Sequence, residues 1–153
     1  MFLYLVQHGK AKNEEEDLAR PLSDNGIAEV KKIASFISRL DITVEEVLHS
    51  SKLRAKQTAE ILAESLAIMN DVSEADSLAP LDDPALWADK LKRKTLSLML
   101  VGHLPHLARL SSLLLSGDKE KSIIAFKMGG VVCLKRDDAG TWTLQWIITP
   151  EII

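Results

Sequence analysis

Residues 2–10 read Phe2-Leu3-Tyr4-Leu5-Val6-Gln7-His8-Gly9-Lys10. Five apolar residues run without a break and then give way to polar residues around His8. A short apolar run that stops at a glycine is typical of a buried strand in a parallel sheet. Ligands of such sheets bind beyond the carboxyl ends of the strands. We therefore expect His8 at the functional edge, with Gly9 letting the backbone turn and a ligand come close, although an ordinary strand end can also carry a His-Gly pair.

Length and composition indicate one globular domain. The chain has 153 residues, enough for a substantial core, and we assign 1–153 to a single domain. The net charge of −3 gives no general surface for a polyanion, so we expect no nucleic-acid partner. No apolar stretch approaches the ~18 residues of a membrane span, and the apolar start lacks the basic leader of a signal peptide. We expect a monomeric cytoplasmic protein with no membrane partner.

Strand-like and helix-like segments alternate through most of the chain. Ser23 is expected to cap a helix that runs to about Leu40, and Ser50 or Ser51 to cap the next one. The alternation predicts an α/β fold, a three-layer α/β/α sandwich with a mainly parallel central sheet. The predicted strands lie at 2–6, 44–49, 95–101, 130–135 and 141–148, with a short one near Val72, and the predicted helices at 24–40, 51–66, 84–94 and 104–117.

Two of the predicted strands, far apart in the sequence, end in turns that carry His8 and His103. Equivalent ends of parallel strands lie at the same edge of a sheet, so neighbouring strands would bring both histidines into one pocket. Arg54, in the first turn of a predicted helix, and Arg20, just ahead of another, can reach this edge. A helix N-terminus favours anions, and guanidinium groups match phosphate oxygens. These residues predict a phosphate site suited to phosphoryl transfer.

Four segments follow one another in a recognisable order. They are Leu3 to Lys10, then Arg20-Pro21-Leu22-Ser23 with Gly26, then Ser-Ser-Lys-Leu-Arg-Ala-Lys-Gln-Thr-Ala at 50–59, and finally Val101-Gly102-His103-Leu104-Pro105. Together they resemble the histidine phosphatase superfamily (phosphoglycerate-mutase-like), and most of all its small SixA-type phosphohistidine phosphatase branch. The resemblance spans nearly the whole chain and implies a phosphoglycerate-mutase-like fold.

The resemblance also implies a role for each site residue. His8 would be the nucleophile that forms a phosphohistidine intermediate, which water then hydrolyses. His103 would hold a phosphoryl oxygen and stabilise charge in the transition state, while Arg54 and Arg20 would clamp the other oxygens. Gln7 and Gly9 complete the predicted phosphate-binding set. No metal and no cofactor are implied.

Three further residues invite a chemical interpretation. His103 and His106 have a spacing seen in some metal sites, but no acidic or cysteine partner stands nearby, so we expect His106 on the helix surface or at the pocket rim. His49 is expected at a strand end, where it could line the pocket. Cys133 is the only cysteine, which excludes an intramolecular disulfide, and its apolar surroundings predict a small buried hydrophobe.

The chain departs from the superfamily signature at one position. The signature begins with arginine, and here that position is Gln7, which can donate a hydrogen bond to phosphate but carries no charge. Losing one preorganised donor commonly costs roughly 10²- to 10³-fold in rate. Lys10 adds a positive charge nearby, but ordinary members also have a lysine there, so no compensation is indicated. A weakly active module that mainly binds phosphate or phosphohistidine therefore stays open as an alternative.

The leaving group bears on the substrate class. Enzymes that act on alkyl phosphates need a general acid to protonate the leaving oxygen, and Asp82 and Asp83 are the only acids that we can place in a suitable loop. A phosphohistidine with a protonated ring expels neutral imidazole and needs no acid. We therefore predict a phosphatase for phosphohistidine on a protein, such as a phosphotransfer domain, with a small-molecule phosphomonoesterase acting on small phosphate esters as the alternative.

Overall fold

The apolar run at the start of the chain forms an interior strand of a six-stranded sheet. The computed structural model describes all 153 residues. The strands are β1 (Phe2–Gln7), β2 (Glu46–His49), β3 (Val72–Glu74), β4 (Leu98–Gly102), β5 (Val131–Arg136) and β6 (Trp142–Ile148). The helices are α1 (Asp24–Ile37), α2 (Leu53–Ser65), α3 (Pro84–Arg93) and α4 (His106–Ser116), with short 3₁₀ turns η1 (Met69–Asp71) and η2 (Pro150–Ile152).

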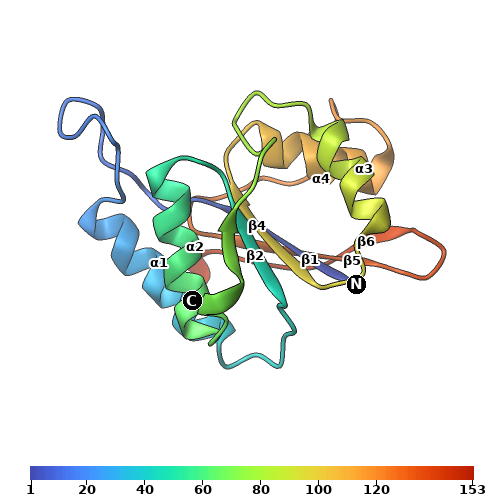
Figure 1. Ribbon diagram of the computed structural model, residues 1–153, viewed down its shortest axis with the longest axis horizontal. Coiled ribbons are helices and arrows are strands. Elements are labelled where there is room, and N and C mark those ends of the chain that lie inside the picture. Colours follow the sequence, from blue (N-terminus) through green and yellow to red (C-terminus); the bar gives the residue numbers. More distant parts are fainter.

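The sheet is mostly parallel and is covered on both faces. Its strand order is β3-β2-β4-β1-β5-β6. The first four strands in this order pair in parallel, whereas β5 is antiparallel to both β1 and β6. Helices α1 and α2 lie on one face, and α3 and α4 lie on the other (Figure 1). The predicted α/β/α sandwich with a mainly parallel sheet is confirmed.

Alternate residues of β1 enter different halves of the core. Tyr4 and Val6 belong to the apolar cluster under α1 and α2. Leu3 and Leu5 belong to the second cluster, with residues of α3 and α4, and both leucines are fully buried. Burying one such side chain contributes about 1.5–3 kcal/mol. Because both faces of β1 are packed, the strand is anchored in both layers at once.

The pairing of β1 with β4 sets the position of the functional edge. Gln7 lies opposite Gly102 in the parallel register, and the His8 amide donates to the Gly102 carbonyl at 3.1 Å. The antiparallel β5 begins at the same edge, where the Gly129 amide donates to the Gln7 carbonyl at 2.9 Å. The residues that follow β1 and β4 therefore leave the sheet side by side.

Several element boundaries differ from the prediction. Helix α1 ends at Ile37 and α4 begins only at His106, after Pro105, which stands at its N-cap and has no amide hydrogen to donate. The strands at 44–49 and 95–101 begin later, at Glu46 and Leu98. The expected serine cap of α2 is wrong: the helix begins at Leu53, so Lys52 occupies the N-cap, without a side-chain hydrogen bond. The Ser50 hydroxyl is bonded to His103 instead.

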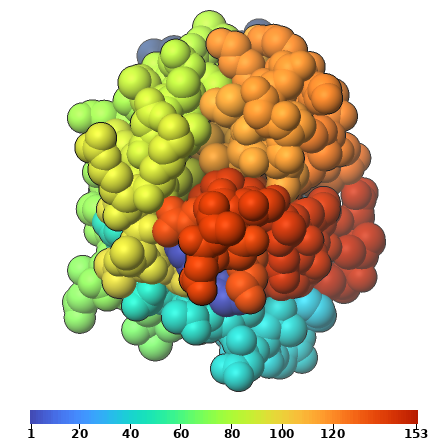
Figure 2. Space-filling view, turned by 90° about the vertical axis from the view of Figure 1, so that its right-hand side faces the viewer, coloured from blue at the N-terminus to red at the C-terminus, as the bar shows by residue number.

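The β5–β6 hairpin points away from the functional edge. Its turn lies at the end of the molecule opposite to the 11–21 loop (Figure 1). Figure 2 looks onto that end, where the hairpin separates the α3–α4 side from the 38–45 connection. Cys133 in β5 is buried, as its apolar surroundings predict, and burial raises the pKa of its thiol to about 12. None of the helices is long and apolar enough to cross a membrane.

Gly26 offers a test of how α1 is seated against the loop that follows β1. A Cβ at this position would lie 2.0 Å from the Lys10 carbonyl oxygen, which also accepts hydrogen bonds from the Ser23 amide and hydroxyl. We expect Gly26→Ala to lower the free energy of unfolding by about 1–3 kcal/mol, the usual cost of overpacking. Urea denaturation measures it, with the exposed Asn25→Ala as control; equal stability of the two variants would contradict the crowding.

Candidate active site

The two predicted histidines meet at the carboxyl edge of the sheet. His8 directly follows β1, and His103 directly follows β4. Their ring centroids are 5.0 Å apart. His8 is half-buried, whereas His103 is only 2% exposed. The structure therefore brings these two side chains together, as the strand-end argument predicts.

The surroundings of His8 select one tautomer of its ring. His8 Nδ1 lies 2.7 Å from the Gly9 carbonyl oxygen, so it must carry the proton and donate. The other nitrogen, Nε2, then holds the bare lone pair. Arg54 Nε donates to this nitrogen at 3.4 Å. His8 Nε2 is thus the atom that is chemically ready to attack an electrophile.

Gly9 contributes space rather than a free amide. Its amide donates to Thr58 Oγ1 at 3.0 Å, and the Thr58 hydroxyl donates in turn to the Arg54 carbonyl at 2.7 Å. A Cβ on Gly9 would lie 2.6 Å from a methyl group of Val30. The predicted part of Gly9 in phosphate binding therefore does not run through this amide. Thr58, which sequence reasoning did not single out, fastens the His8 turn to α2.

Arg54 and Arg20 approach His8 from two different elements. Arg54 is the second residue of α2, so it combines its charge with the positive end of a helix. Arg20 has a left-handed φ of 47° and donates from Nε to the Lys12 carbonyl at 3.1 Å. Burial lowers the pKa of His8, and the charges of Arg54 and Arg20 lower it further. Both predicted arginines therefore act electrostatically on the same ring.

His103 is held by a serine that sequence reasoning assigned to a helix cap. Ser50 Oγ lies 2.6 Å from His103 Nε2, while the Lys52 amide donates to the same hydroxyl at 3.4 Å. Since Ser50 Oγ accepts from Lys52, it can direct its own proton to His103 Nε2, which leaves the ring proton on Nδ1. Burial lowers the pKa of His103 to about 3, and the neighbouring basic side chains of His8, Arg54 and Lys52 lower it further. The ring is neutral at pH 7.

Gln7 is almost buried beside the two histidines. The residue is 8% exposed, and its Oε1 has no hydrogen-bond partner. Lys10, the other residue considered as a source of charge, is exposed, and its carbonyl oxygen binds Ser23. The structure therefore puts a neutral amide at this end of β1, and the lysine whose charge acts on His103 is Lys52 rather than Lys10.

The expectation for His106 is wrong. His106 is 0% exposed, and neither of its ring nitrogens has a hydrogen-bond partner. It lies in the first turn of α4, which packs against β1, so its side chain is enclosed by the protein and is not on the helix surface. His49 is also buried, with Nδ1 2.8 Å from the Ser50 carbonyl oxygen, at the end of β2.

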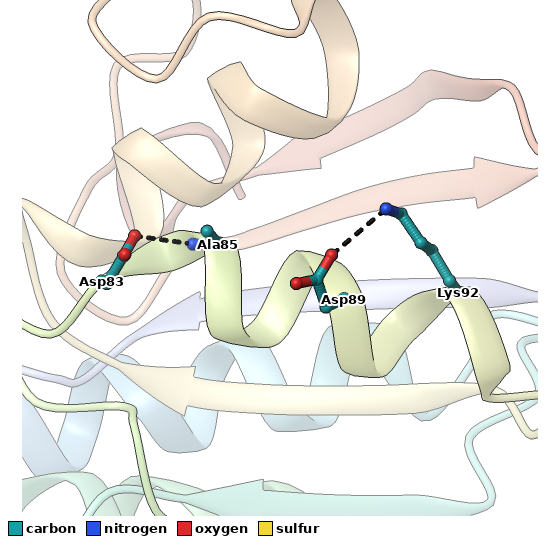
Figure 3. A network of polar contacts seen from close by, with 4 residues as sticks. All are labelled: Asp83, Ala85, Asp89 and Lys92. Carbon is teal, nitrogen blue, oxygen red and sulfur yellow. Dashed lines mark hydrogen bonds and ion pairs between the residues drawn. The ribbon is translucent and has the colours of Figure 1, made fainter.

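Asp82 and Asp83 accept hydrogen bonds from backbone amides close to them in the sequence. Asp82 Oδ2 accepts from the Ala79 amide at 2.9 Å. Asp83 Oδ1 accepts from the Ala85 amide at 2.9 Å and caps α3 (Figure 3). Neither carboxylate bonds to His8 or His103. Their charges act instead on His106, whose pKa is lowered by burial and partly restored by the two aspartates.

The arrangement combines a bare ring nitrogen with several groups that attract an anion. No group of three or more His, Cys, Asp or Glu side chains is placed to hold a metal ion. A phosphoryl group at His8 Nε2 would instead lie beside Arg54 and His103, and the charge of Arg20 acts on the same ring. Guanidinium groups and a helix start stabilise the charge that spreads over phosphoryl oxygens during transfer. The geometry therefore fits nucleophilic phosphoryl transfer.

Comparison with known proteins agrees with this chemistry. Residues 3–79 match the sequence model of the histidine phosphatase superfamily (branch 1). The chain is 27% identical over 155 aligned positions to the phosphohistidine phosphatase SixA of Escherichia coli (strain K12), with 98% of this chain and 94% of that protein covered. It is 31% identical over 142 positions to an uncharacterised protein of Picosynechococcus sp., with 88% and 85% covered.

The structural comparison leads to the same group. A solved structure of the protein histidine phosphatase SixA, complexed with tungstate, superposes with a TM-score of 0.86 at 26% identity. It covers 98% of this chain and 97% of that one. The family match spans the segment that carries His8, Arg20 and Arg54, and the structural match extends over the segment that carries His103. The chain belongs to the histidine phosphatase superfamily, branch 1, as a SixA-type phosphatase.

Proposed function

We propose that the protein hydrolyses phosphohistidine carried on another protein, through a covalent phosphohistidine intermediate at His8. One observation carries the proposal: the Gly9 carbonyl accepts a hydrogen bond from His8 Nδ1–H, which leaves Nε2 unprotonated beside Arg54. The E. coli relative is named a phosphohistidine phosphatase, and this likeness supports the substrate class. Location in the cytoplasm and a monomeric state stay predictions.

In the first step, His8 Nε2 attacks the phosphorus of the substrate. The new Nε2–P bond forms while the N–P bond of the substrate breaks, and the bonding pair stays with the departing ring. When that ring already carries a proton on its other nitrogen, it leaves as neutral imidazole without a general acid. Arg54, Arg20 and His103 hold the phosphoryl oxygens during the transfer, with Gln7 as a further donor.

In the second step, water attacks the phosphorus and the Nε2–P bond breaks. The bonding pair returns to Nε2, and because Nδ1 already carries its proton against the Gly9 carbonyl, His8 also leaves as neutral imidazole. Both protons of the water end on the inorganic phosphate. The hydrogen bond from His8 Nδ1–H to the Gly9 carbonyl therefore keeps Nε2 unprotonated for the first step and lets His8 leave as neutral imidazole in the second.

A small-molecule phosphomonoesterase is the alternative within the same mechanism. It would need an acid for an alkoxide leaving group. Asp82 and Asp83 bond to backbone amides of their own loop and to no residue of the pocket, which favours the substrate whose leaving group needs no acid. The proposed substrate is therefore a phosphohistidine-bearing protein such as a phosphotransfer domain.

We expect His8→Ala to lose phosphate release from a phosphohistidine-bearing phosphotransfer domain and to form no phosphoenzyme. Wild-type turnover should be unchanged in excess EDTA, because the proposed steps use no metal. Phosphate release and acid-quenched gels of the labelled enzyme measure these outcomes. Turnover that survives in His8→Ala, or wild-type turnover that EDTA removes, would contradict the mechanism.

A parallel panel of sugar phosphates and nucleotides decides the substrate class. Ester hydrolysis that is faster than phosphohistidine hydrolysis, and that falls in Asp82→Asn or Asp83→Asn, would favour the phosphomonoesterase.

The protonation of His8 gives a test that does not depend on the substrate. Burial, Arg54 and Arg20 all lower the pKa of His8, so its ring should stay neutral as pH falls through 6.5, the ordinary histidine value. An NMR titration should show a midpoint below 6.5. Arg20→Met should move this midpoint upward, because one repelling charge is removed, whereas Arg39→Met in the turn after α1 should not. A wild-type midpoint above 6.5 would show that the proposed electrostatics are wrong.

The second candidate, a phosphate- or phosphohistidine-binding module with little catalysis, rests on Gln7. A guanidinium stabilises the negative charge that is spread over the phosphoryl oxygens in the transition state better than a neutral amide does. We expect Gln7→Arg to raise the rate of phosphoryl transfer by about 10-fold or more, and to tighten the binding of inorganic phosphate by less. Single-turnover kinetics and calorimetry measure the two effects. A variant no faster than wild type would show that Gln7 is no handicap, and a wild type that binds phosphate without any turnover would favour the binding module.

A further inference from the structure

The most exposed large apolar side chains of the protein lie near the candidate active site. Leu18 is 88% exposed and Leu81 is 81% exposed, and no other large apolar residue of the chain is as accessible. Leu53 and Leu104 are also exposed. The first of these directly precedes a site arginine, and the second directly follows the second histidine. Exposed apolar side chains that cluster in this way mark surfaces that contact another molecule.

Two loops bring the most exposed leucines to the carboxyl edge of the sheet. Leu18 lies in the 11–21 loop, two residues before a site arginine, and this loop stands out from the body of the protein (Figure 1). Leu81 lies in the loop between β3 and α3. That loop passes the end of β4, because a Cβ on Gly102 would lie 3.5 Å from the Leu78 carbonyl oxygen. We call the four exposed residues at this edge the leucine rim: Leu18, Leu53, Leu81 and Leu104.

The loop that carries the first leucine of the rim is also acidic. Glu14, Glu15 and Glu16 are exposed, and none of them forms an ion pair. Glu14 and Glu15 line one open hollow together with Asn13 and Arg20, so negative charge stands beside a guanidinium that attracts phosphate. The glutamates repel a small anionic phosphate, whereas they attract a partner that carries a basic side chain beside its phosphohistidine.

We propose that the leucine rim is the docking surface for the phosphohistidine-bearing protein, and that Glu14 and Glu15 pair with a basic side chain of this partner. A histidine side chain is short, so its phosphoryl group reaches His8 Nε2 only when the surrounding surface of the partner lies against the rim. Burial of the leucines then favours association. The inference rests on the proposed function and adds which surface, apolar with a basic margin, the substrate protein presents.

Loop variants and two substrates test the rim. The protein substrate is the best of the phosphotransfer domains of the same organism, and the small substrate is free phosphohistidine, which contacts only the pocket. Leu18→Ser and Leu81→Ser should each lower kcat/KM for the domain by roughly 5-fold or more, mainly through KM, as expected for a buried contact residue of an interface. For free phosphohistidine, kcat/KM should change by less than about 2-fold, as for other surface substitutions.

A leucine at the other edge of the sheet provides the matched control. Leu96 is exposed just ahead of β4, and Leu96→Ser should leave kcat/KM for both substrates unchanged. Equal losses on both substrates in the rim variants would show that the leucines shape the pocket and would overturn the docking role. Rim variants that lose nothing on the domain would overturn it as well.

Charge reversal should act in opposite directions on the two substrates. Glu14→Lys combined with Glu15→Lys should lower kcat/KM for the domain by roughly 10-fold, because like charges at an interface repel, and should raise it for anionic free phosphohistidine. Both changes should shrink in about 0.5 M salt. Asp138→Lys, in the β5–β6 turn at the opposite end of the protein, is the control. A fall for both substrates, or a rise for both, would overturn the pairing with a basic side chain.

Binding without turnover keeps this proposal distinct from the proposed function. In the His8→Ala background, calorimetry should show binding of the phosphorylated domain, and Leu18→Ser should weaken it by roughly 5-fold or more. A domain that binds through the rim but is not dephosphorylated by wild type would contradict only the proposed function. Hydrolysis of free phosphohistidine by a protein that neither binds nor prefers any phosphotransfer domain would overturn only the docking surface.

Sedimentation of the wild type alone tests the competing occupant of the rim, a second copy of this chain. We expect a monomer at the concentrations of the binding experiment. A dimer that Leu18→Ser dissociates would assign the leucine rim to self-association and would overturn the proposal.

Discussion

The parallel pairing of β1 with β4 is the constraint on which the site depends. Only with Gln7 opposite Gly102 do His8 and His103 leave the sheet at the same level. A slip by one residue would exchange the faces of β1 and move its leucines into the other layer. Both faces of the strand are packed, so the hydrophobic core opposes such a slip directly. The same residues that stabilise the fold therefore fix the distance between the two histidines.

Burial gives this edge its chemical character. Two histidines and two arginines stand close together, and each positive charge makes protonation of its neighbours harder. The two histidine rings therefore favour the neutral form, while the guanidinium groups of the arginines keep their positive charge. The result is a pocket with neutral rings and fixed positive groups, in which a nucleophilic nitrogen and an anion-binding surface coexist. A bound phosphoryl group is negatively charged, so its attraction to the basic groups would offset their repulsion of one another.

The sequence predicted those parts of the structure that a strong local pattern specifies. The apolar runs before His8 and His103 gave the two central strands, and parallel strand ends gave their meeting point. The predicted serine cap of α2 was wrong. By its local sequence Ser50 is a good cap candidate, and only the fold shows that its hydroxyl is bonded to His103. His106 was misplaced for a similar reason: no pattern in the sequence tells which face of a first helical turn is enclosed.

The departure at Gln7 changes what the neighbouring layer must supply. A guanidinium carries donors on all sides and no acceptor, so an arginine at this position would need only space and would attract phosphate in every rotamer. An amide has one face that attracts a phosphoryl oxygen and one that repels it, so its contribution depends on which way it is held. In the structure Gln7 Oε1 is buried without a hydrogen-bond partner, so no protein group holds the amide in one of its two orientations.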